Sequence, residues 1–252
     1  MALNTDKNSY TVLFSVIMVS VVGAILAYLA TGLKDKITEN QRFEKQQNIL
    51  YAMGVHNNTD ESSVNFIPTT EVDQRFNELI KGQYVIQGGE ATPEEDAFMI
   101  DLKKELDLIK SGKDGKLPLF IGEKDGKTFY IFPMYGKGLW DAIWGYMSVD
   151  ESLTITGVYF DHKGETPGLG ANIKMRFFMD DFIGESIASD SGYTPIEVVK
   201  GNNDPLNNDK SDAQVDALAG ATITGNGVSA MIKESIRLYE PYFEKVRSQT
   251  KS

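Results

Sequence analysis

Two threonines stand two residues apart in the glycine-rich stretch AGATITGNGV (219–228), directly before a pattern that is typical of an amphipathic helix. The start of a helix offers free backbone amides and the positive end of the helix dipole, so it can bind a phosphate. The same place also favours a hydroxyl that caps the helix. The residues alone leave two interpretations open: Thr224 or Asn226 caps the final helix after a turn at Gly220, or Thr224 carries a phosphate covalently.

Few other side chains in this chain are suited to catalysis. It has no cysteine and only two histidines, His56 and His162, which are far apart and which we expect to be solvated loop residues. The lack of cysteine excludes disulfides, thiol catalysis and a cysteine-ligated iron–sulfur cluster carried by this chain. A zinc site would need mostly carboxylate ligands, so we expect no metal site. We also expect no catalytic residue, because any redox chemistry has to come from a cofactor.

The net charge is −11, with 36 acidic residues against 25 basic ones. This excess of negative charge repels phosphate backbones, and no basic cluster interrupts it. We therefore expect no nucleic-acid partner.

A membrane anchor is predicted at the N-terminus. The 26 residues between Lys7 and Lys34 carry no charge. As a helix they would be about 39 Å long, which exceeds the roughly 30 Å of a bilayer's hydrocarbon core. A secretory signal peptide is the alternative, but its apolar region is shorter and LAYLATG is a poor cleavage site. We expect residues 1–34 to form the N-terminal tail and a retained transmembrane helix in a lipid bilayer. The flanking lysines are balanced, so charge leaves the topology open.

The pattern after the anchor predicts helices first. A juxtamembrane helix at 34–53 ends before Gly54, and a short helix follows at 71–81. A third helix is expected to start with Thr92 as its N-cap, Pro93 in its first position and Glu95 completing a capping box, and to run to Gly112.

Strands dominate the second half of the chain. LPLFIGEKDGKTFYIFPMYG is a hairpin signature around Asp125-Gly126. Further elements are predicted in order: strands at 143–149, 153–160 and 193–199, a helical stretch near 171–184, a strand-like start at 213 and a final helix at 225–239 closed by Pro241. Helices and strands mix without a βαβ alternation, so the fold class is α+β with an antiparallel-rich sheet. We divide the chain into 1–34, juxtamembrane helices and an insert at 35–116, and one domain at 117–252.

The GATIT stretch, preceded by Asp216 and Ala219, resembles the flavinylation motif of the FMN-binding domain family. That motif reads Ser or Asp, Gly, Ala, Ser or Thr, any residue, and Ser or Thr. The resemblance implies that Thr224 is joined to FMN through a phosphoester, made by a flavin transferase that uses FAD and magnesium. Gly220, Ala221 and Thr222 would shape the turn and donate to the phosphate. The chain departs from the motif at Ala219, which is not the attachment point.

Two more stretches carry the resemblance. HKGETPGLGAN (162–172) is similar to the family's ETPGLG segment, although Pro167-Gly168 alone is an ordinary turn pair. YGKGLWDAIWGY (135–146) is similar to its GKGLW element, although Trp140 alone reads as a core residue. The resemblance implies two groups that border the flavin ring: Glu165, Thr166, Gly168, Leu169 and Gly170 on one side, and Gly138, Leu139 and Trp140 on the other. Lys137 would offset phosphate charge and Asp216 would brace the turn.

With the anchor and the NILYAMG helix, nearly the whole chain resembles the family of C subunits of the sodium-translocating NADH:quinone oxidoreductases. The resemblance implies a flavoprotein that acts as a one-electron carrier between NADH and quinone, together with the other subunits of a respiratory complex. It also implies a place in the bacterial cytoplasmic (inner) membrane, with the domain on the periplasmic side. The G subunit of the Rnf complex, a ferredoxin:NAD oxidoreductase, is the nearest alternative. A non-redox anchored assembly module and a free-standing flavoenzyme are the others, although no general acid–base pair sits in a recognisable motif.

Overall fold

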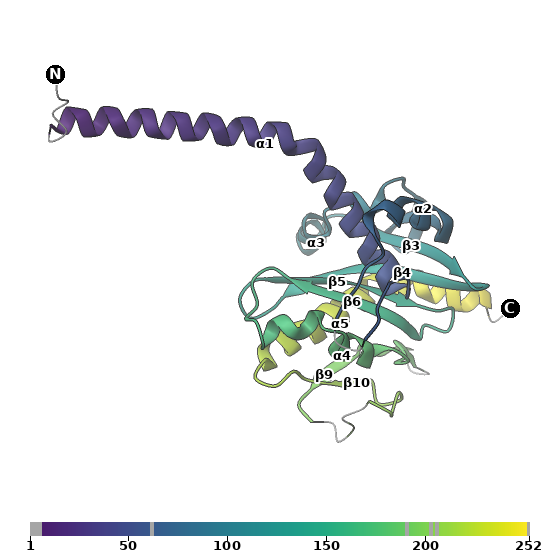
Figure 1. Cartoon of the computed structure of the whole chain (residues 1–252). Helices are drawn as coiled ribbons and strands as arrows, with labels where there is room; N and C mark the ends of the chain where they lie inside the picture. Colours follow the sequence, from purple (N-terminus) through teal and green to yellow (C-terminus); the bar gives the residue numbers. More distant parts are fainter. Residues whose placement is uncertain (1–6, 61–62, 190–191, 202–203, 205–206, 251–252) are drawn as a thin grey trace. The chain divides into compact units, whose positions relative to one another are not determined.

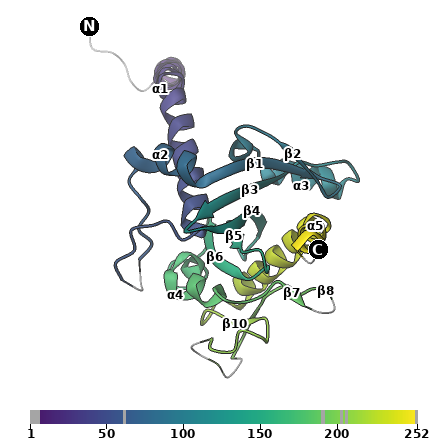
Figure 2. The ribbon, with the colours of Figure 1, turned by 90° about the vertical axis from the view of Figure 1, so that its right-hand side faces the viewer.

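The computed structural model describes residues 7–60, 63–189, 192–201, 204 and 207–250 (Figure 1). The chain divides into two compact units, Met1–Arg42 and Phe43–Ser252. The second unit holds a six-stranded sheet and its helices, and it is the unit that carries the predicted site (Figures 1 and 2).

Helix α1 (Asn8–Ala52) contains the predicted anchor. Its apolar N-terminal part is exposed, and by length and composition it can cross a membrane. The separate juxtamembrane helix that we expected is the continuation of α1, because neither glycine nor proline interrupts residues 33–53. The predicted end is confirmed: Gly54 takes a positive φ of 76°, and the Val55 N–H donates to the Leu50 carbonyl at 2.9 Å.

The sheet is antiparallel throughout, in the order β2-β1-β3-β4-β5-β6. Its strands are β1 (Ile80–Gln87), β2 (Glu90–Pro93), β3 (Leu117–Lys124), β4 (Lys127–Lys137), β5 (Ala142–Val149) and β6 (Ile155–His162). The predicted hairpin is confirmed, with Asp125 and Gly126 both at positive φ between β3 and β4. The strands predicted at 143–149 and 153–160 correspond to β5 and β6.

The two faces of the sheet receive different helices. Along β4, Phe132 packs on Tyr239 of helix α5 (Thr222–Thr250), with ring centroids 4.8 Å apart. The end of α1 lies on the other face, since a Cβ built on Gly157 of β6 would meet the Ala52 carbonyl oxygen at 2.3 Å. Side chains alternate between the faces of a strand, so this arrangement buries both faces. Ile49, Leu50 and Ala52 of α1 are fully buried in the resulting core.

Shorter elements complete the second unit. They are helices α2 (Thr69–Leu79), η1 (Ala97–Met99), α3 (Leu102–Lys110), η2 (Gly170–Lys174), α4 (Arg176–Met179) and η3 (Asp180–Phe182), and strands β7 (Ala188–Ser189), β8 (Gly192–Tyr193), β9 (Glu197–Val199) and β10 (Gln214–Asp216). The helix expected near 171–184 is three short turns, because Met175 is extended and divides it. The strand expected at 193–199 is likewise divided between β8 and β9. Strand β10 is where the strand-like start was expected, and it pairs in parallel with β9.

The capping box that we predicted at Thr92 is wrong. Thr92 and Pro93 lie in β2, opposite Val85 and Tyr84 of β1, a strand that the sequence pattern did not reveal. Strand β2 is at the edge of the sheet, where a proline without an N–H is tolerated. The helix begins at Leu102 instead, with the Asp101 carboxylate accepting from the Lys104 N–H at 3.4 Å.

The final helix is longer than predicted at both ends. It begins at Thr222 and continues past Pro241 to Thr250. Proline removes one helical hydrogen bond, but the aromatic side chains around it stay packed on β4. Phe243, beyond the proline, has its ring 5.7 Å from that of Phe132. Tertiary packing therefore allows the helix to continue beyond Pro241, although proline normally ends a helix.

Candidate functional site

Three predicted segments meet at the N-terminal end of α5. They are the β4–β5 connection (138–141), the segment after β6 (163–170) and the turn at 219–221. The first is brought close because α5 packs along β4, so that a Cβ on Gly227 would meet the Lys137 carbonyl oxygen at 2.4 Å. The second is brought close because β6 pairs with β5, which places His162 opposite Ile143.

Thr224 and Glu165 are in direct contact at this meeting point. The Thr224 hydroxyl donates to Oε2 of Glu165 at 2.6 Å. Both residues are buried, with Thr224 1% and Glu165 4% exposed. The sequence suggested both residues as parts of one site, but not this bond between them.

The second oxygen of Glu165 is held by backbone amides. Oε1 accepts from the Trp140 N–H at 2.9 Å and from the Asp141 N–H at 3.5 Å. Burial raises the pKa of Glu165, but the hydrogen bonds from Thr224 and from the 139–141 amides outweigh it, and the net pKa lies below the usual value. Glu165 is therefore a carboxylate at neutral pH, with one oxygen fixed by the backbone and the other facing Thr224.

Two glycines make room for this carboxylate. A Cβ on Gly170 would lie 2.5 Å from both Glu165 Oε2 and Thr224 Oγ1. A Cβ on Gly138 would lie 2.6 Å from Glu165 Oε1. Real Cβ atoms do not approach oxygen this closely, so the Thr224–Glu165 pair requires glycine at both positions.

Four exposed apolar side chains belong to the segments that carry or hydrogen-bond the buried pair. Trp140 is 67% exposed, and Leu139, Leu169 and Ile223 are exposed as well. The indole Nε1–H of Trp140 donates to the Thr166 hydroxyl at 3.2 Å, which ties the two loops together. Trp140 is thus not the core residue that its sequence context alone suggests. We call Leu139, Trp140, Leu169 and Ile223 the apolar rim.

The start of α5 differs from the predicted cap. Thr222 is the first helical residue and is exposed, while Thr224 is already inside the first turn. The Gly225 N–H donates to the Ala221 carbonyl at 2.9 Å, so neither Thr224 nor Asn226 caps the helix. Gly220 takes a positive φ of 72°, as expected of the turn, and a Cβ on it would meet Leu169 at 2.9 Å. The Ala221 N–H donates to the Leu218 carbonyl at 3.1 Å. The first amides of a helix have no partner within it, so the start of α5 can donate to an anion.

Four further residues stood out in the sequence. His162 Nδ1 accepts from the Glu165 N–H at 3.2 Å, which fixes the backbone of that loop. Lys137 is exposed at the end of β4. Oδ1 of Asp216 is buried and accepts no hydrogen bond from a described residue, so that oxygen does not brace the turn.

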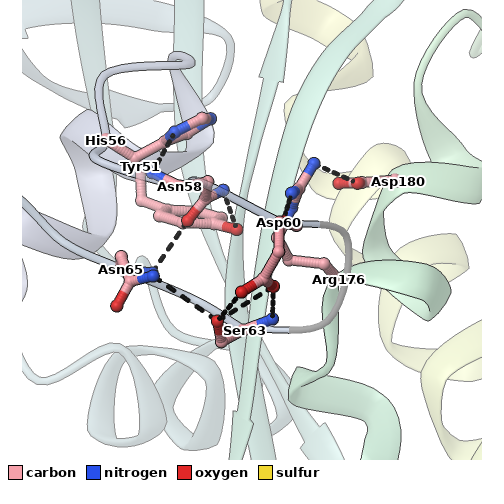
Figure 3. Close-up of polar contacts among 8 residues, drawn as sticks. All are labelled: Tyr51, His56, Asn58, Asp60, Ser63, Asn65, Arg176 and Asp180. Carbon is pink, nitrogen blue, oxygen red and sulfur yellow. Dashed lines mark hydrogen bonds and ion pairs between the residues drawn. The ribbon is translucent and has the colours of Figure 1, made fainter.

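The fourth, His56, belongs to a different part of the molecule (Figure 3). Its ring packs on Tyr51, with centroids 5.0 Å apart, and its Nδ1 accepts from the Asn58 N–H. Asn58 in turn donates to the Tyr51 hydroxyl at 3.0 Å, and Arg176 donates to the Asp60 carbonyl. These bonds hold the loop after α1 against the domain, which is a structural role.

Comparison with known proteins points to one family. The model of the FMN-binding domain family matches residues 138–237, which include the three segments of the site. The C subunit of the Na(+)-translocating NADH-quinone reductase of Neisseria meningitidis serogroup B is 33% identical over 98% of this chain and 98% of its own. The C subunit of the Yersinia pestis reductase is 30% identical over 97% of this chain and 95% of its own.

Solved structures agree with these relatives. The C subunit of the Parabacteroides distasonis reductase shares 32% of its residues and superposes with a TM-score of 0.69, covering 84% of this chain and 96% of that one. The NqrC protein of Shewanella oneidensis is 25% identical, with a TM-score of 0.66 over 83% of this chain and 99% of that one. With its apolar N-terminal helix, its antiparallel sheet and the matched FMN-binding domain, this chain belongs to the NqrC family, the C subunits of the Na(+)-translocating NADH-quinone reductases.

Proposed function

We propose that this protein carries FMN covalently, through a phosphoester to Thr224, and passes electrons singly between NADH and quinone within a sodium-pumping respiratory complex. The observation that carries the proposal is the hydroxyl of Thr224 in the first turn of α5, within a matched FMN-binding domain. The chain has no cysteine and few histidines, so the flavin would supply the redox chemistry and the protein its position.

The residues around Thr224 are suited to bind FMN. The unpaired amides at the start of α5 and the turn of Gly220, Ala221 and Thr222 would hold the phosphate. A flat aromatic ring needs apolar surface, and the apolar rim supplies it beside Gly138, Thr166 and Gly168. Glu165 accepts the hydrogen bond of Thr224, and Gly170 leaves space for both side chains. Attachment at Thr224 requires the hydroxyl to become accessible, because Thr224 is 1% exposed.

The proposal extends to partners and place. We infer that a flavin transferase, using FAD and magnesium, modifies Thr224, and that other subunits of the complex exchange electrons with the flavin. The long apolar part of α1 supports a single pass through the cytoplasmic membrane. The periplasmic side for the domain follows from the resemblance to the family alone. Within the chain we assign 117–252 to FMN binding and 35–116 to juxtamembrane helices and an insert. Membership of the NqrC family argues against the Rnf-type G subunit that the sequence left open, and the experiment below tests the proposal against a non-redox assembly module.

The test is the mass of the intact protein produced with and without its flavin transferase. We expect a mass increase equal to one FMN phosphoester in wild type and in Thr222→Ala, but not in Thr224→Ala. Thr222 is the matched control because it lies in the same turn and is exposed. In a denaturing gel, the bands of wild type and Thr222→Ala should fluoresce, and the band of Thr224→Ala should not.

Two outcomes contradict the proposal. A flavin-labelled Thr224→Ala protein would move the attachment to another residue. A colourless wild-type protein from native membranes would favour the assembly module. Copurification with the other subunits of an NADH:quinone reductase would support the assignment to that complex.

A further inference from the structure

The bond between Thr224 and Glu165 suggests a role for this carboxylate in loading the cofactor. We propose that Glu165 is the general base that removes the Thr224 proton when FMN is attached, an inference that rests on the proposed function. A general base must lie within hydrogen-bond reach of the proton that it takes, roughly 2.6–3.2 Å between heavy atoms. Glu165 Oε2 is 2.6 Å from Thr224 Oγ1, and both residues are buried.

The two oxygens of Glu165 have different surroundings. Oε1 is fixed by the Trp140 and Asp141 amides, which leaves Oε2 directed at the hydroxyl. Burial raises the pKa of Glu165, but the hydrogen bonds from Thr224 and from these amides lower it by more, so Glu165 stays ionised. An ionised, immobile acceptor leaves the lone pairs of Oγ1 free for a phosphorus atom, and the pair needs little reorganisation before the proton moves.

The step balances without a redox partner. Thr224 Oγ1 attacks the phosphorus on the riboflavin side of the pyrophosphate in a flavin adenine dinucleotide. The Oγ1–P bond forms, the P–O bond to adenosine monophosphate breaks, and adenosine monophosphate leaves with the bonding electrons. The hydroxyl proton passes to Glu165 Oε2 and from there to water.

The other charged groups near Glu165 are engaged elsewhere or exposed. On its own loop, Lys163 pairs with Asp141 of the β4–β5 connection at 3.2 Å, and both side chains are well exposed. His162 contacts the Glu165 backbone and not its carboxylate. Lys137 ends β4 and Lys174 lies in η2, both exposed, and the first turn of α5 holds no acidic residue. Of the carboxylates in the described part of the chain, Glu165 is the one bonded to Thr224.

The experiment measures flavin transfer to the unloaded, full-length protein. Protein made without transferase is incubated in detergent with purified transferase, FAD and magnesium, and labelling is followed by gel fluorescence and intact mass from about pH 5 to pH 8. General-base catalysis is worth roughly 100- to 10,000-fold in rate. We expect Glu165→Gln to label Thr224 at least about 100-fold more slowly but to reach full labelling on long incubation.

Two further variants distinguish a base from a structural support. Glu151→Gln makes the same carboxylate-to-amide change at an exposed position between β5 and β6, outside the site, and should label at the wild-type rate. Glu165→Asp keeps a carboxylate and should label faster than Glu165→Gln but more slowly than wild type. In the plot of labelling rate against pH, the decrease on the acidic side should shift relative to wild type. Any decrease caused by titration of the transferase itself should be the same for both proteins. If Glu165→Gln fails to fold by circular dichroism, this shift decides the question.

The outcomes separate the base from the proposed function. Labelling of Glu165→Gln at the wild-type rate, or a decrease on the acidic side that Glu165→Asp does not shift, overturns the role of Glu165 alone. Absence of label on wild type, or label on a residue other than Thr224, overturns the proposed function.

Discussion

The Thr224 hydroxyl and the Glu165 carboxylate come from positions 59 residues apart, and each depends on glycines that leave space for it. Gly170 carries the tightest constraint, because it faces both oxygens of the hydrogen bond at once. Its backbone does not require glycine, as its φ is not in the left-handed region. The requirement at this position is steric.

Gly170→Ala should therefore disrupt the pair. The added methyl would lie 2.5 Å from both oxygens, and overpacking of this kind costs about 1–3 kcal/mol. We expect a lower melting temperature and a loss of most covalent flavin in cells that contain the transferase. The matched control is Gly164→Ala in the same loop, where the added carbon would be 3.5 Å from the Asp141 Cβ, an ordinary contact. Equal flavin content in the two variants would contradict the steric argument.

At this scale the sequence identified the participants but not their contact. GATIT, ETPGLG and GKGLW brought the right segments to attention as parts of one site. That Glu165 bonds Thr224 depends on the pairing of β6 with β5 and on the packing of α5 along β4, which no local pattern encodes. The exposure of Trp140 has the same origin: its amide, not its ring, is directed to the buried carboxylate.

The elements show where local signals prevail and where packing overrides them. The Asp125-Gly126 hairpin and the glycine end of α1 formed as predicted, because positive φ values at those places are decided by the residues themselves. The Thr92-Pro93 signal failed because pairing with β1 competes with capping. Pro241 failed to end α5 because Tyr239 and Phe243 hold the helix on Phe132. Strand β1 was missed because IKGQYVIQ lacks a clear alternation.

Helix α1 offers a matched test of its two halves. Leu50 is fully buried in the core of the second unit, whereas Leu33 is exposed in the apolar part. Leu50→Ala should lower the free energy of unfolding by about 2–5 kcal/mol, the range for buried leucines. Leu33→Ala should leave it within about 0.5 kcal/mol. The measurement is denaturant unfolding of the detergent-solubilised protein, followed by the near-ultraviolet signal of the domain. Similar losses in both variants would mean that the end of α1 is not part of the core.

At the scale of the whole molecule, acidic residues dominate the charge and affect stability through pH. Burial, together with Asp216, Asp180 and Asp204, raises the pKa of Asp181 to about 6, although Lys210 opposes the shift. Between about pH 4 and pH 6 the folded state then holds a proton that the unfolded state releases. The contribution of Asp181 to the free energy of unfolding is therefore complete below about pH 4 and is lost as the pH rises through about 6.

Asp181→Asn should remove this slope. We expect a higher melting temperature at pH 7 than in wild type and a smaller decrease in melting temperature between pH 5 and pH 7. Part of the decrease should remain, because burial also raises the pKa of Glu185. Asp209→Asn is the contrasting control, because hydrogen bonds from Ser211 lower the pKa of Asp209. Asp209→Asn should therefore not have a higher melting temperature than wild type at pH 7. Parallel melting curves for wild type and Asp181→Asn across this range would refute the assignment.

Composition and pattern were enough to predict the α+β class, the antiparallel sheet and the anchor. The order of the strands was beyond them, since β1 and β2 precede α3 in the chain yet extend the sheet beside β3. Register and strand order depend on contacts between distant residues, and a single sequence does not display these.

The burial of Ile49, Leu50 and Ala52 bears on how this domain can be shed from a membrane. A protease that cuts within the exposed stretch before Phe43 leaves the second compact unit whole. A cut after Ala52 removes four core side chains, those of Ile49, Leu50, Tyr51 and Ala52, along with the anchor. It also removes the Ala52 carbonyl against which Gly157 packs. Limited digestion should therefore yield a stable soluble fragment that begins upstream of residue 43, and none that begins at Met53.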